Sequence, residues 1–284
     1  MPPSIRWPAD ASRRMQAPSS DHSCRVLAIM PRSPQFNLSQ MDADEWLQSL
    51  GDESVDLVIT DPPYESLEKH RAIGTTTRLK RSKSSSNDWF GIFPNSRFPE
   101  FFGEVFRVLK RNCHFYLFCD QETMFVAKPL AQAAGFRFWK PLVWDKAAIG
   151  MGYHYRCRYE FILFFEKGKR NLADLGVPDI LTARRIHNGY PAEKPVELCE
   201  VLVRQSTAPG ELVCDPFMGS AATGVAAMML GRNFVGNDVS PKSLSLAQER
   251  LAAAGGARAS IKTSGRGRQI DLIASSRQRR VARS

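Results

Sequence analysis

Residues 211–224 read ELVCDPFMGSAATG, a short apolar strand that runs into a turn of small residues. Such a turn lets a ligand approach the backbone and meet free N–H groups of the helix expected from about Ser220. No GK[ST] follows, so the turn is not a P-loop, and it is not GxGxxG. A second strand, 233–238, ends in Gly-Asn-Asp238, an acid that could accept hydrogen bonds from ribose hydroxyls. The alternative is that the small residues serve only helix–sheet packing.

A second motif follows an earlier strand. Residues 55–64 read VDLVITDPPY, in which a buried strand over Val55–Thr60 is broken by two prolines. Ligands of open α/β sheets lie beyond the carboxyl ends of strands, so Asp61-Pro62-Pro63-Tyr64 stands where chemistry is expected. Two prolines remove two N–H donors and leave carbonyl oxygens. An acid, rigid carbonyls and an aromatic ring suit an exocyclic amino group on a flat base; the alternative is a plain strand-ending turn.

Strands and helices alternate outward from these motifs. Strands are expected at 55–60, 113–119, 136–144, 159–166, 211–214 and 233–238. Helices are expected at 98–110, 122–134, 194–206, from about 220, and 241–254. This alternation predicts an α/β fold with a doubly wound, mostly parallel sheet covered on both faces. Residues 65–97 form a long polar loop and 167–190 are turn-rich, and loops of such length are usually functional or disordered.

Composition limits the classes of protein. The chain has 284 residues, of which 43% are hydrophobic and 24% charged, and its formal net charge is +10. No apolar run approaches the roughly 18 residues of a membrane span, and the first residues lack the apolar core of a secretory signal. Residues 255–284 carry eight basic side chains and one acid. Positive charge gathered there and in 65–97 suits a polyanion such as nucleic acid, or merely solubilises the chain.

The six cysteines form no CxxC pair, and no histidine lies at zinc-finger spacing from them. Several stand inside apolar runs, where a free thiol behaves as a small hydrophobe. The sequence therefore predicts no disulfide, no metal site and a reducing, cytoplasmic location.

Taken together, the two motifs resemble the DNA amino-methyltransferases that use S-adenosylmethionine. DPPY matches the catalytic motif of that family, and DPFMGSAATG matches its cofactor motif, commonly DPFxGSGTT. The catalytic motif comes first, and HNGYPAEKP (187–195) stands just before the cofactor motif, which is the order of the permuted β class. GMGYHYRCRYEFILFFEKGKR (150–170) also resembles this class, with MboII-type modification enzymes as the nearest branch. The resemblance covers residues 36 to about 254 and implies the methyltransferase fold with an inserted target-recognition region.

The resemblance implies roles for individual residues. Asp61 and the Pro62 carbonyl would accept hydrogen bonds from the target amino group, and Tyr64 would stack on a base flipped out of the duplex. Asp215 would hold the methionine end of the cofactor, Asp238 the ribose, and Lys194 and Pro195 would border the carboxylate side. Asp42 matches an acid near the adenine, although it fits a helix N-cap equally well. The implied catalytic residues are Asp61, Pro62, Pro63 and Tyr64; the implied cofactor residues are Asp215, Pro216, Phe217, Gly219, Ser220, Asp238, Lys194, Pro195 and Asp42.

Some positions depart from the family pattern. Ala221 replaces the usual second glycine, so its backbone is expected to avoid positive φ. Asp238 stands where the family more often has Glu, and two extra residues separate His187 from Lys194. The aromatic cluster 153–155 is expected to pack against the domain, with support of a flipped base as the alternative.

The implied function is methylation of the N6 amino group of adenine at a specific site in double-stranded DNA, as the modification component of a restriction-modification system. DPPY favours adenine within the family, and an N4-cytosine enzyme is the first alternative. An RNA or protein-glutamine methyltransferase and a non-catalytic basic DNA-binding module are the others. The implied domains are a disordered leader (1–24), a methyltransferase domain (25–254) with a DNA-contact loop (65–97) and a target-recognition segment (167–190), and a flexible basic tail (255–284). A homodimer and a cognate restriction endonuclease are compatible partners.

Overall fold

The computed structural model describes residues 33–66, 91–150, 155–187, 190 and 192–255, together with the backbone of 259–264 and 267–272. The strands are β1 (Phe36–Gln40), β2 (Val55–Thr60), β3 (Leu109–Cys119), β4 (Arg137–Asp145), β5 (Tyr159–Lys167), β6 (Ile180–Thr182), β7 (Leu212–Asp215), β8 (Asn233–Asn237), β9 (Ala259–Ser264) and β10 (Gly267–Leu272). The helices are α1 (Ala43–Ser49), the 3₁₀ turn η3 (Asn95–Arg97), α3 (Phe98–Val108), α4 (Gln121–Ala133), α5 (Val196–Ser206), α6 (Ala222–Met229) and α7 (Pro241–Gly255).

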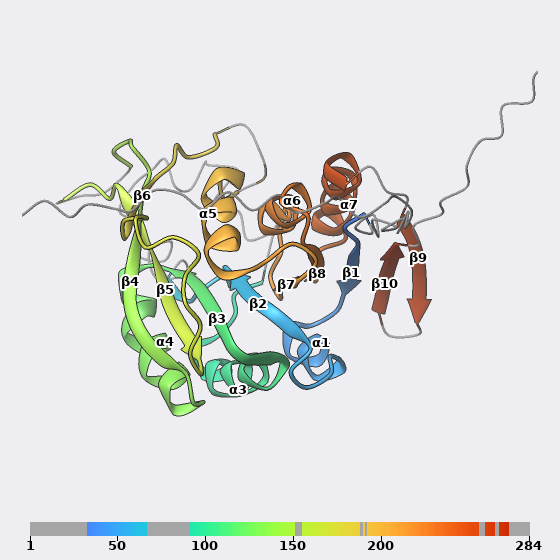
Figure 1. Ribbon diagram of the computed structural model, residues 1–284, viewed down its shortest axis with the longest axis horizontal. Helices are drawn as coiled ribbons and strands as arrows, with labels where there is room; N and C mark the ends of the chain where they lie inside the picture. Colours follow the sequence, from blue (N-terminus) through green and yellow to red (C-terminus); the bar gives the residue numbers. More distant parts are fainter. Residues whose placement is uncertain are drawn as a thin grey trace, which may run out of the picture. The chain divides into compact units, whose positions relative to one another are not determined.

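The described strands form one sheet in the order β6-β4-β5-β3-β2-β7-β8-β1-β10-β9 (Figure 1). Strand β5 runs antiparallel to both of its neighbours, and β10 to both of its own. The remaining neighbours pair in parallel, including β2 with β3 and with β7. The expected mostly parallel α/β sheet is therefore confirmed.

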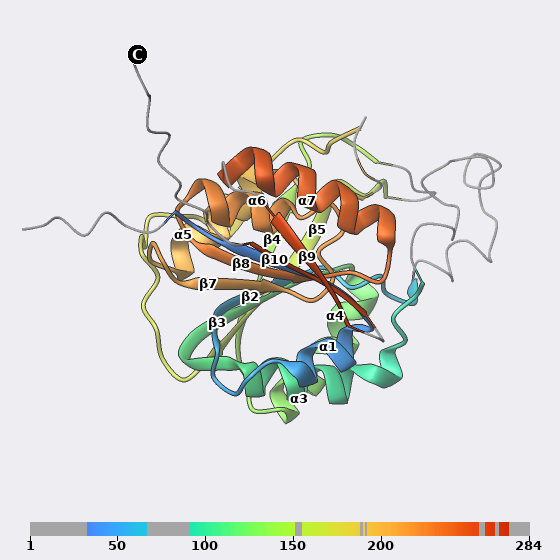
Figure 2. The same ribbon diagram turned by 90° about the vertical axis from the view of Figure 1, so that its right-hand side faces the viewer.

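Helices cover both faces of this sheet, as Figure 2 shows: α5, α6 and α7 lie on one side and α1, α3 and α4 on the other. Every residue of β2 is buried. Because side chains alternate along a strand, Leu57 and Ile59 pack with the α5–α7 layer, whereas Val58 packs with the opposite layer. A strand that is apolar on both faces lies at the centre of a doubly wound sheet.

Most predicted elements are present within a few residues, but three differences stand out. The sequence predicts no strand at β1, it indicates α1 only through the alternative that Asp42 is a helix N-cap, and β6 lies in the stretch interpreted as irregular. The strand expected from Cys113 begins at Leu109, directly after α3. β1 and β6 are short, and a short strand is fixed by its pairing partners more than by its own residue pattern.

Two strands lie within the segment 255–284, for which the sequence predicts a flexible tail. The backbone of β10 pairs antiparallel with β1, with Leu38 opposite Ile270, and β9 pairs with β10. The segment therefore contains regular structure at β9 and β10, and its flexibility stays a prediction. The physical reason is that β1 otherwise presents unpaired backbone groups at an open edge, which an added strand satisfies. The leader 1–24 and most of the 65–97 loop lie outside the described residues.

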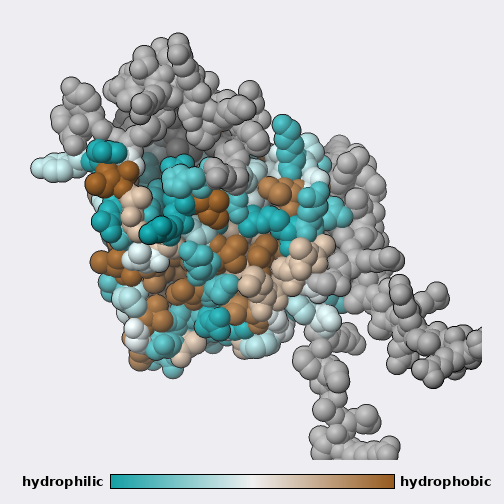
Figure 3. Space-filling view, turned by 90° about the horizontal axis from the view of Figure 1, so that it is seen from above, coloured by the Kyte–Doolittle hydropathy of each residue, from teal (hydrophilic) through white to brown (hydrophobic). Residues whose placement is uncertain are grey.

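The described surface mixes polar and apolar side chains. Exposed large hydrophobic residues come from separate elements, such as Phe125 in α4 and Met229 at the end of α6. On the face drawn in Figure 3, hydrophobic residues are interspersed with hydrophilic ones over the described part. Among the described residues, no helix has both the length and the apolar character needed to cross a membrane. The cysteines that the structure describes are free, and Cys24 lies outside the described part.

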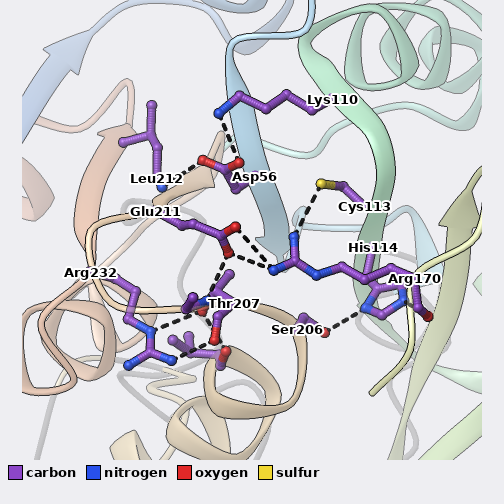
Figure 4. A network of polar contacts seen from close by, with 12 residues as sticks. Asp56, Lys110, Cys113, His114, Arg170, Ser206, Thr207, Glu211, Leu212 and Arg232 are labelled. Carbon is purple, nitrogen blue, oxygen red and sulfur yellow. Dashed lines mark hydrogen bonds and ion pairs between the residues drawn. The ribbon is translucent and has the colours of Figure 1, made fainter. Parts of the chain in front are cut away.

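A polar network ties together the amino ends of β2, β3 and β7 (Figure 4). One oxygen of Asp56 accepts from Lys110 Nζ at 2.8 Å, and the other accepts from the Leu212 amide at 2.9 Å. Glu211 accepts two hydrogen bonds from Arg170, at 2.7 and 3.0 Å. Each of these two carboxylates thus has both oxygens engaged, which is what a purely structural contact requires.

Candidate functional site

Three predicted acids stand at the carboxyl ends of strands, at the other end of the sheet from the polar network of Figure 4. Asp61 follows β2, Asp215 ends β7 and Asp238 follows β8. These three strands are neighbours and run parallel, so their carboxyl ends meet at one edge. The structure therefore brings together the two motifs that are separated by about 150 residues of sequence.

Asp61 belongs to a largely buried cluster of four charged groups, whose side chains are 10% to 25% exposed. The Lys194 ammonium forms an ion pair with Asp61 Oδ2 and lies 3.3 Å from Glu160 Oε2. Glu160 Oε1 in turn accepts from Lys146 Nζ at 2.5 Å. We call Asp61, Glu160, Lys194 and Lys146 the charge cluster; they come from the ends of β2, β5 and β4 and from the approach to α5. It is formally neutral, which is how charges are tolerated inside a protein.

Two oxygens of the charge cluster have no hydrogen-bond donor among the described residues. They are Asp61 Oδ1 and Glu160 Oε2, and both are buried. Glu160 Oε2 still faces the Lys194 ammonium, but Asp61 Oδ1 faces no cation in the same way. A buried acceptor without a donor destabilises a protein, so it indicates a position that a ligand completes.

Burial and charge act in opposite directions on the cluster. Burial raises the pKa of Asp61 above its ordinary value, and the Lys194 ammonium counteracts part of that rise. Burial alone would also raise the pKa of Glu160, but Lys194 and Lys146 hold it below its ordinary value. Burial would lower the pKa of Lys194, yet the two carboxylates raise it. Lys194 therefore stays protonated and is the main group that opposes protonation of Asp61.

The segment 61–66 is anchored by residues that follow the 67–90 stretch. The Phe93 amide donates to the Pro63 carbonyl at 2.7 Å, and Glu65 accepts from the Asn95 amide at 2.8 Å. The Pro62 carbonyl receives no hydrogen bond from any described residue. Tyr64 is 7% exposed, and burial raises its pKa well above the ordinary value, so it stays a neutral phenol. The motif thus leaves the Pro62 carbonyl and Asp61 Oδ1 as acceptors.

The turn after β7 is held by its own acid. Asp215 is buried, and its Oδ1 accepts from Thr60 Oγ1 at 2.9 Å and from the Phe217 amide at 3.1 Å. Burial raises the pKa of Asp215 to about 7. Asp238 Oδ2 accepts from the Gly219 amide at 3.0 Å, which joins the second acid to the same turn. Both acids therefore shape the turn as well as standing at its rim.

The small residues of the turn serve different purposes. Gly219 has φ +50°, a conformation that glycine adopts without strain. A Cβ at Gly224 would lie 2.6 Å from the Phe234 ring, so this glycine permits α6 to pack on β8. The interpretation as helix–sheet packing is therefore supported for Gly224. A Cβ at Gly219 would lie 3.2 Å from the Tyr190 ring, and the role of Gly219 beside a ligand stays a prediction.

The expectation for Ala221 is wrong, because its φ is +57° and its ψ +40°, in the left-handed region. The turn imposes this conformation, since the Ala221 amide donates to the Met218 carbonyl at 2.7 Å just before α6 begins. A left-handed alanine costs roughly 1–2 kcal/mol. The methyl group is fully buried, and burial of about 0.8 kcal/mol per carbon offsets part of that strain.

The two motifs also touch through aromatic rings. Phe217 lies edge-on to Phe93 at 5.1 Å between ring centroids and packs beside Phe101 at 5.7 Å. Phe93 is the residue whose amide holds the Pro63 carbonyl. The Pro216 carbonyl accepts from Asn237 Nδ2 at 3.3 Å, which joins the turn to the end of β8. The predicted catalytic and cofactor segments therefore form one packed unit.

Arg250 links the segment before α5 to the 215–220 turn, and sequence reasoning missed it. Its guanidinium donates to the Ser220 carbonyl at 2.8 Å and pairs with Glu193 at 2.7 Å. Lys194 and Pro195 follow directly, and Pro195 is the N-cap of α5. The segment that contains Lys194 and Pro195 is therefore tied to the turn by the Glu193–Arg250 ion pair. The Lys194 ammonium itself contacts Asp61 and Glu160.

Asp42 is the N-cap of α1, as the alternative interpretation proposed. Its side chain accepts from the Asp44 amide at 3.0 Å and forms an ion pair with Arg97. Arg97 also donates to Asp44 at 2.7 Å and lies 4.6 Å above the Phe93 ring. Arg97 gave no signal in the sequence, because its partners are brought near only by packing of α1 beside α3.

The aromatic cluster 153–155 is only partly described. Tyr155 is fully exposed, so packing against the domain is wrong for this residue. Tyr153 and His154 lie outside the described residues. Glu160 and Lys146 were also missed; Glu160 stands in the stretch 150–170 that carried part of the resemblance, but no spacing rule pointed to its carboxylate.

Comparison with known sequences matches the chain to a family described as DNA methylase, over residues 55–181 and 175–249. It is similar to a protein named putative methylase YubD from Escherichia coli, with 30% identity over 207 residues that cover 70% of this chain and 83% of that protein. It is also similar to the DNA adenine methyltransferase YhdJ of Escherichia coli, with 25% identity over 253 residues that cover 75% and 81%.

Solved structures share the fold. TTHA0409, a putative DNA modification methylase from Thermus thermophilus that was solved in complex with S-adenosylmethionine, has a TM-score of 0.56 at 24% identity and covers 76% of this chain and 95% of its own. The cytosine-N4-specific PvuII DNA methyltransferase has a TM-score of 0.61 at 20% identity and covers 77% and 86%. At these identities the likeness shows the fold alone.

Proposed function

This chain belongs to the DNA methylase family of N6 and N4 enzymes, and from that premise we propose that it methylates the N6 amino group of adenine in double-stranded DNA. The observation that carries the proposal is Asp61 Oδ1, a buried acceptor without a donor at the carboxyl end of β2. The Pro62 carbonyl beside it is also without a donor among the described residues. Two adjacent acceptors match the two N–H bonds of one exocyclic amino group.

The methyl donor that the family implies is S-adenosylmethionine, which supplies, when bound, a methyl group made electrophilic by its sulfonium. The residues present fit it: the 215–220 turn contains a positive-φ glycine, and Asp238 stands beyond β8. Each Asp238 oxygen accepts one backbone hydrogen bond, from Gly219 or from Ser240, and keeps a lone pair that can accept from a hydroxyl. We propose that Asp215, Pro216, Phe217, Gly219 and Ser220 form the cofactor turn. Asp238 would hold the ribose, and Asp42 and Pro195 would lie at its margins.

Asp61 and Pro62 would prepare the amino group for attack. Hydrogen bonds to both N–H groups draw the nitrogen away from planarity and localise its lone pair for in-line transfer. When the nitrogen takes the methyl group, the carbon–sulfur bond of the sulfonium would break and the nitrogen must release one proton. Asp61 Oδ1, hydrogen-bonded to that N–H, would accept the proton. Tyr64 would stack on the base, and Pro63 would limit the space around it. Because the target atom is inside a duplex, the base must be flipped out of the stack.

Adenine is proposed over cytosine because residues 61–64 read DPPY rather than SPPY. Among the similar proteins, YhdJ is named as an adenine enzyme and PvuII as an N4-cytosine enzyme, so an N4-cytosine activity is the second candidate. Incubation of unmethylated, high-complexity DNA with the protein and S-adenosylmethionine, followed by nucleoside mass spectrometry, tests both. N6-methyladenine is expected; N4-methylcytosine alone would replace the proposal with the second candidate, and neither product would refute both.

The DNA contacts are proposed from charge and position. We expect the basic stretches within 65–97 and 255–284 to neutralise phosphates and residues 167–190 to contribute base contacts. Four further points stay predictions from the sequence. They are that the protein belongs to a restriction-modification system, that it has a cognate endonuclease, that it forms a homodimer and that it is cytoplasmic.

A further inference from the structure

The charge cluster has a feature that the proposed chemistry does not use: Asp61 is held by a lysine which a second carboxylate shares. We propose that Lys194 and Glu160 are positioning residues for methyl transfer. In this arrangement Lys194 keeps Asp61 ionised, and Glu160, anchored by Lys146, holds the ammonium on one oxygen of Asp61 so that the other stays open to the target amino group. This inference rests on the proposed function, because it concerns the acceptor role of Asp61.

The first step is the need for a charge. A buried carboxylate without a cation takes up a proton, since burial favours its neutral form. A protonated carboxyl group presents an O–H donor and is a weaker acceptor. Lys194 is itself buried, with 10% of its side chain exposed, and its ammonium contacts Asp61 directly. It therefore preserves the ionised form on which the acceptor role depends.

The second step is the need to keep one oxygen free. An ammonium has three donors, and with Asp61 as its sole partner it could engage both carboxylate oxygens. Glu160 Oε2 lies 3.3 Å from the Lys194 ammonium and draws it away from Asp61 Oδ1. Glu160 is fixed in this position because its other oxygen accepts from Lys146 at 2.5 Å. Asp61 thus binds Lys194 through Oδ2, and Oδ1 has no donor among the described residues.

A purely structural role would predict a different arrangement. Buried ion pairs add little to stability relative to apolar packing, and most buried polar groups of a structural network are hydrogen-bonded, although Asp44 Oδ1 in the pair with Arg97 is not. The Asp56–Lys110 pair fits that description, because both Asp56 oxygens are engaged. The charge cluster leaves two oxygens without hydrogen-bond donors among the described residues. An incomplete set at a strand end that carries the catalytic motif indicates a functional arrangement.

The test measures kcat against pH for the full-length protein and for Lys194→Met, Lys194→Arg and Glu160→Gln. Lys110→Met is the matched control, since Lys110 pairs with Asp56 at the other end of β2. Product is measured as methylated nucleoside from unmethylated DNA at saturating S-adenosylmethionine. Circular dichroism and thermal melting establish that each variant is folded. The charged and titratable groups around Asp61 are Lys194, Glu160, Lys146, Tyr64, Cys119, Asp120 and Asp215.

Lys194→Met and Glu160→Gln should move the acid limb of the pH profile of kcat in opposite directions. Lys194→Met should lower kcat at neutral pH by about 100-fold and shift the limb to higher pH, because Asp61 then protonates more readily. Glu160→Gln should shift the limb to lower pH, because a like charge is removed, and should lower kcat by about tenfold on the plateau. Lys194→Arg should restore most of the wild-type profile, and Lys110→Met should reproduce it.

Asp215 has a pKa of about 7, so its own titration can add a second limb to the pH profile of kcat. The same profiles are therefore measured in an Asp215→Asn background, where the limb that moves with residues 194 and 160 must persist. Binding of S-adenosylmethionine by calorimetry should stay within a few fold in Lys194→Met. A large loss of cofactor affinity would instead support the role at the cofactor carboxylate that the family resemblance implies.

Several results would overturn the inference. A pH-independent loss in Lys194→Met, limbs that move in the same direction, or normal kinetics in both variants would each do so. Wild-type protein that forms no methylated base would refute the proposed function instead. In that case infrared spectroscopy of the carboxylate bands still decides the electrostatic step, which requires Asp61 to be protonated in Lys194→Met at neutral pH and ionised in the wild type. If Lys194→Met does not fold, Glu160→Gln alone must show the downward shift.

Discussion

Strand β2 carries an aspartate–lysine pair at each end, and the two pairs differ in one respect. At the amino end, Asp56 accepts from Lys110 with one oxygen and from the Leu212 amide with the other. At the carboxyl end, Asp61 contacts Lys194 with one oxygen, and its other oxygen is buried with no donor among the described residues. Asp56, with both oxygens engaged, ties strands together, whereas the free oxygen of Asp61 stands at the strand end that carries the DPPY motif and can receive a ligand there.

The lysines differ as well. Lys110 is 42% exposed along its side chain, whereas Lys194 is 10% exposed. An exposed ammonium is screened by water and contributes little, whereas a buried one acts strongly on the charge of its neighbour. The same type of pair therefore serves to tie strands together at one end of β2 and to set a protonation state at the other.

The largest contrast is expected from removing each aspartate in turn. Asp61→Ala should reduce the methyl-transfer rate by about 10²–10³-fold, or about 3–4 kcal/mol of transition-state stabilisation, because the nitrogen loses a preorganised acceptor. Affinity for S-adenosylmethionine should change by no more than a few fold. Single-turnover rates and calorimetry measure the two quantities. A near-normal rate would show that Asp61 has no role in methyl transfer.

Asp56→Ala should do the reverse. The Leu212 amide would lose its acceptor, and a buried unsatisfied amide costs about 1–3 kcal/mol of unfolding free energy. The rate per folded molecule should be unchanged. Urea unfolding followed by circular dichroism gives the stability, and the transfer assay gives the rate. If the rate falls as in Asp61→Ala, the two ends of β2 are not functionally distinct.

The pH dependence of stability tests a third acid, Asp215. It lies at the carboxyl ends of the strands, as Asp61 does, but it accepts hydrogen bonds from Thr60 and Phe217. Its pKa is about 7 in the folded protein against an ordinary 3.8, so folding takes up a proton between these values. Stability linked to this group is therefore present below about pH 4 and is lost as the pH rises towards 7. Asp215→Asn has no carboxyl group to ionise and therefore does not lose this stability at high pH. Its free energy of unfolding at pH 8 should exceed that of the wild type by about 1–2 kcal/mol, which is less than the whole pKa shift would give. Thermal or urea unfolding at pH 5 and pH 8 is the measurement, and a constant difference between the two pH values would contradict it.

Asp238 should give the smallest effect. Its proposed role is uniform binding of the cofactor ribose, so Asp238→Ala should raise KM for S-adenosylmethionine about tenfold, or about 1.4 kcal/mol, with a smaller fall in kcat. Steady-state kinetics with varied cofactor separate the two parameters. An unchanged KM would count against the ribose role and leave Asp238 as a support for the Gly219 amide.

The sequence by itself determined the fold class, most of the helices and strands, and the edge at which the acids gather. These features follow from local patterns: apolar periodicity, prolines after β2, and small residues after β7. The N-cap role of Asp42 was also visible, because capping depends on residues two or three positions away.

The charges that meet at the site come together only through packing of distant segments. Lys194 and Asp61 are 133 positions apart, and Glu160 and Lys146 come from two further elements, so no spacing in the sequence connects them. The left-handed conformation of Ala221 and the pairing of β10 with β1 have the same origin. An isolated alanine avoids positive φ, and a polar, basic segment has little to bury alone. The packed turn and the open edge of β1 reverse these local preferences, because contacts between distant segments outweigh conformational terms of about 1–2 kcal/mol per residue.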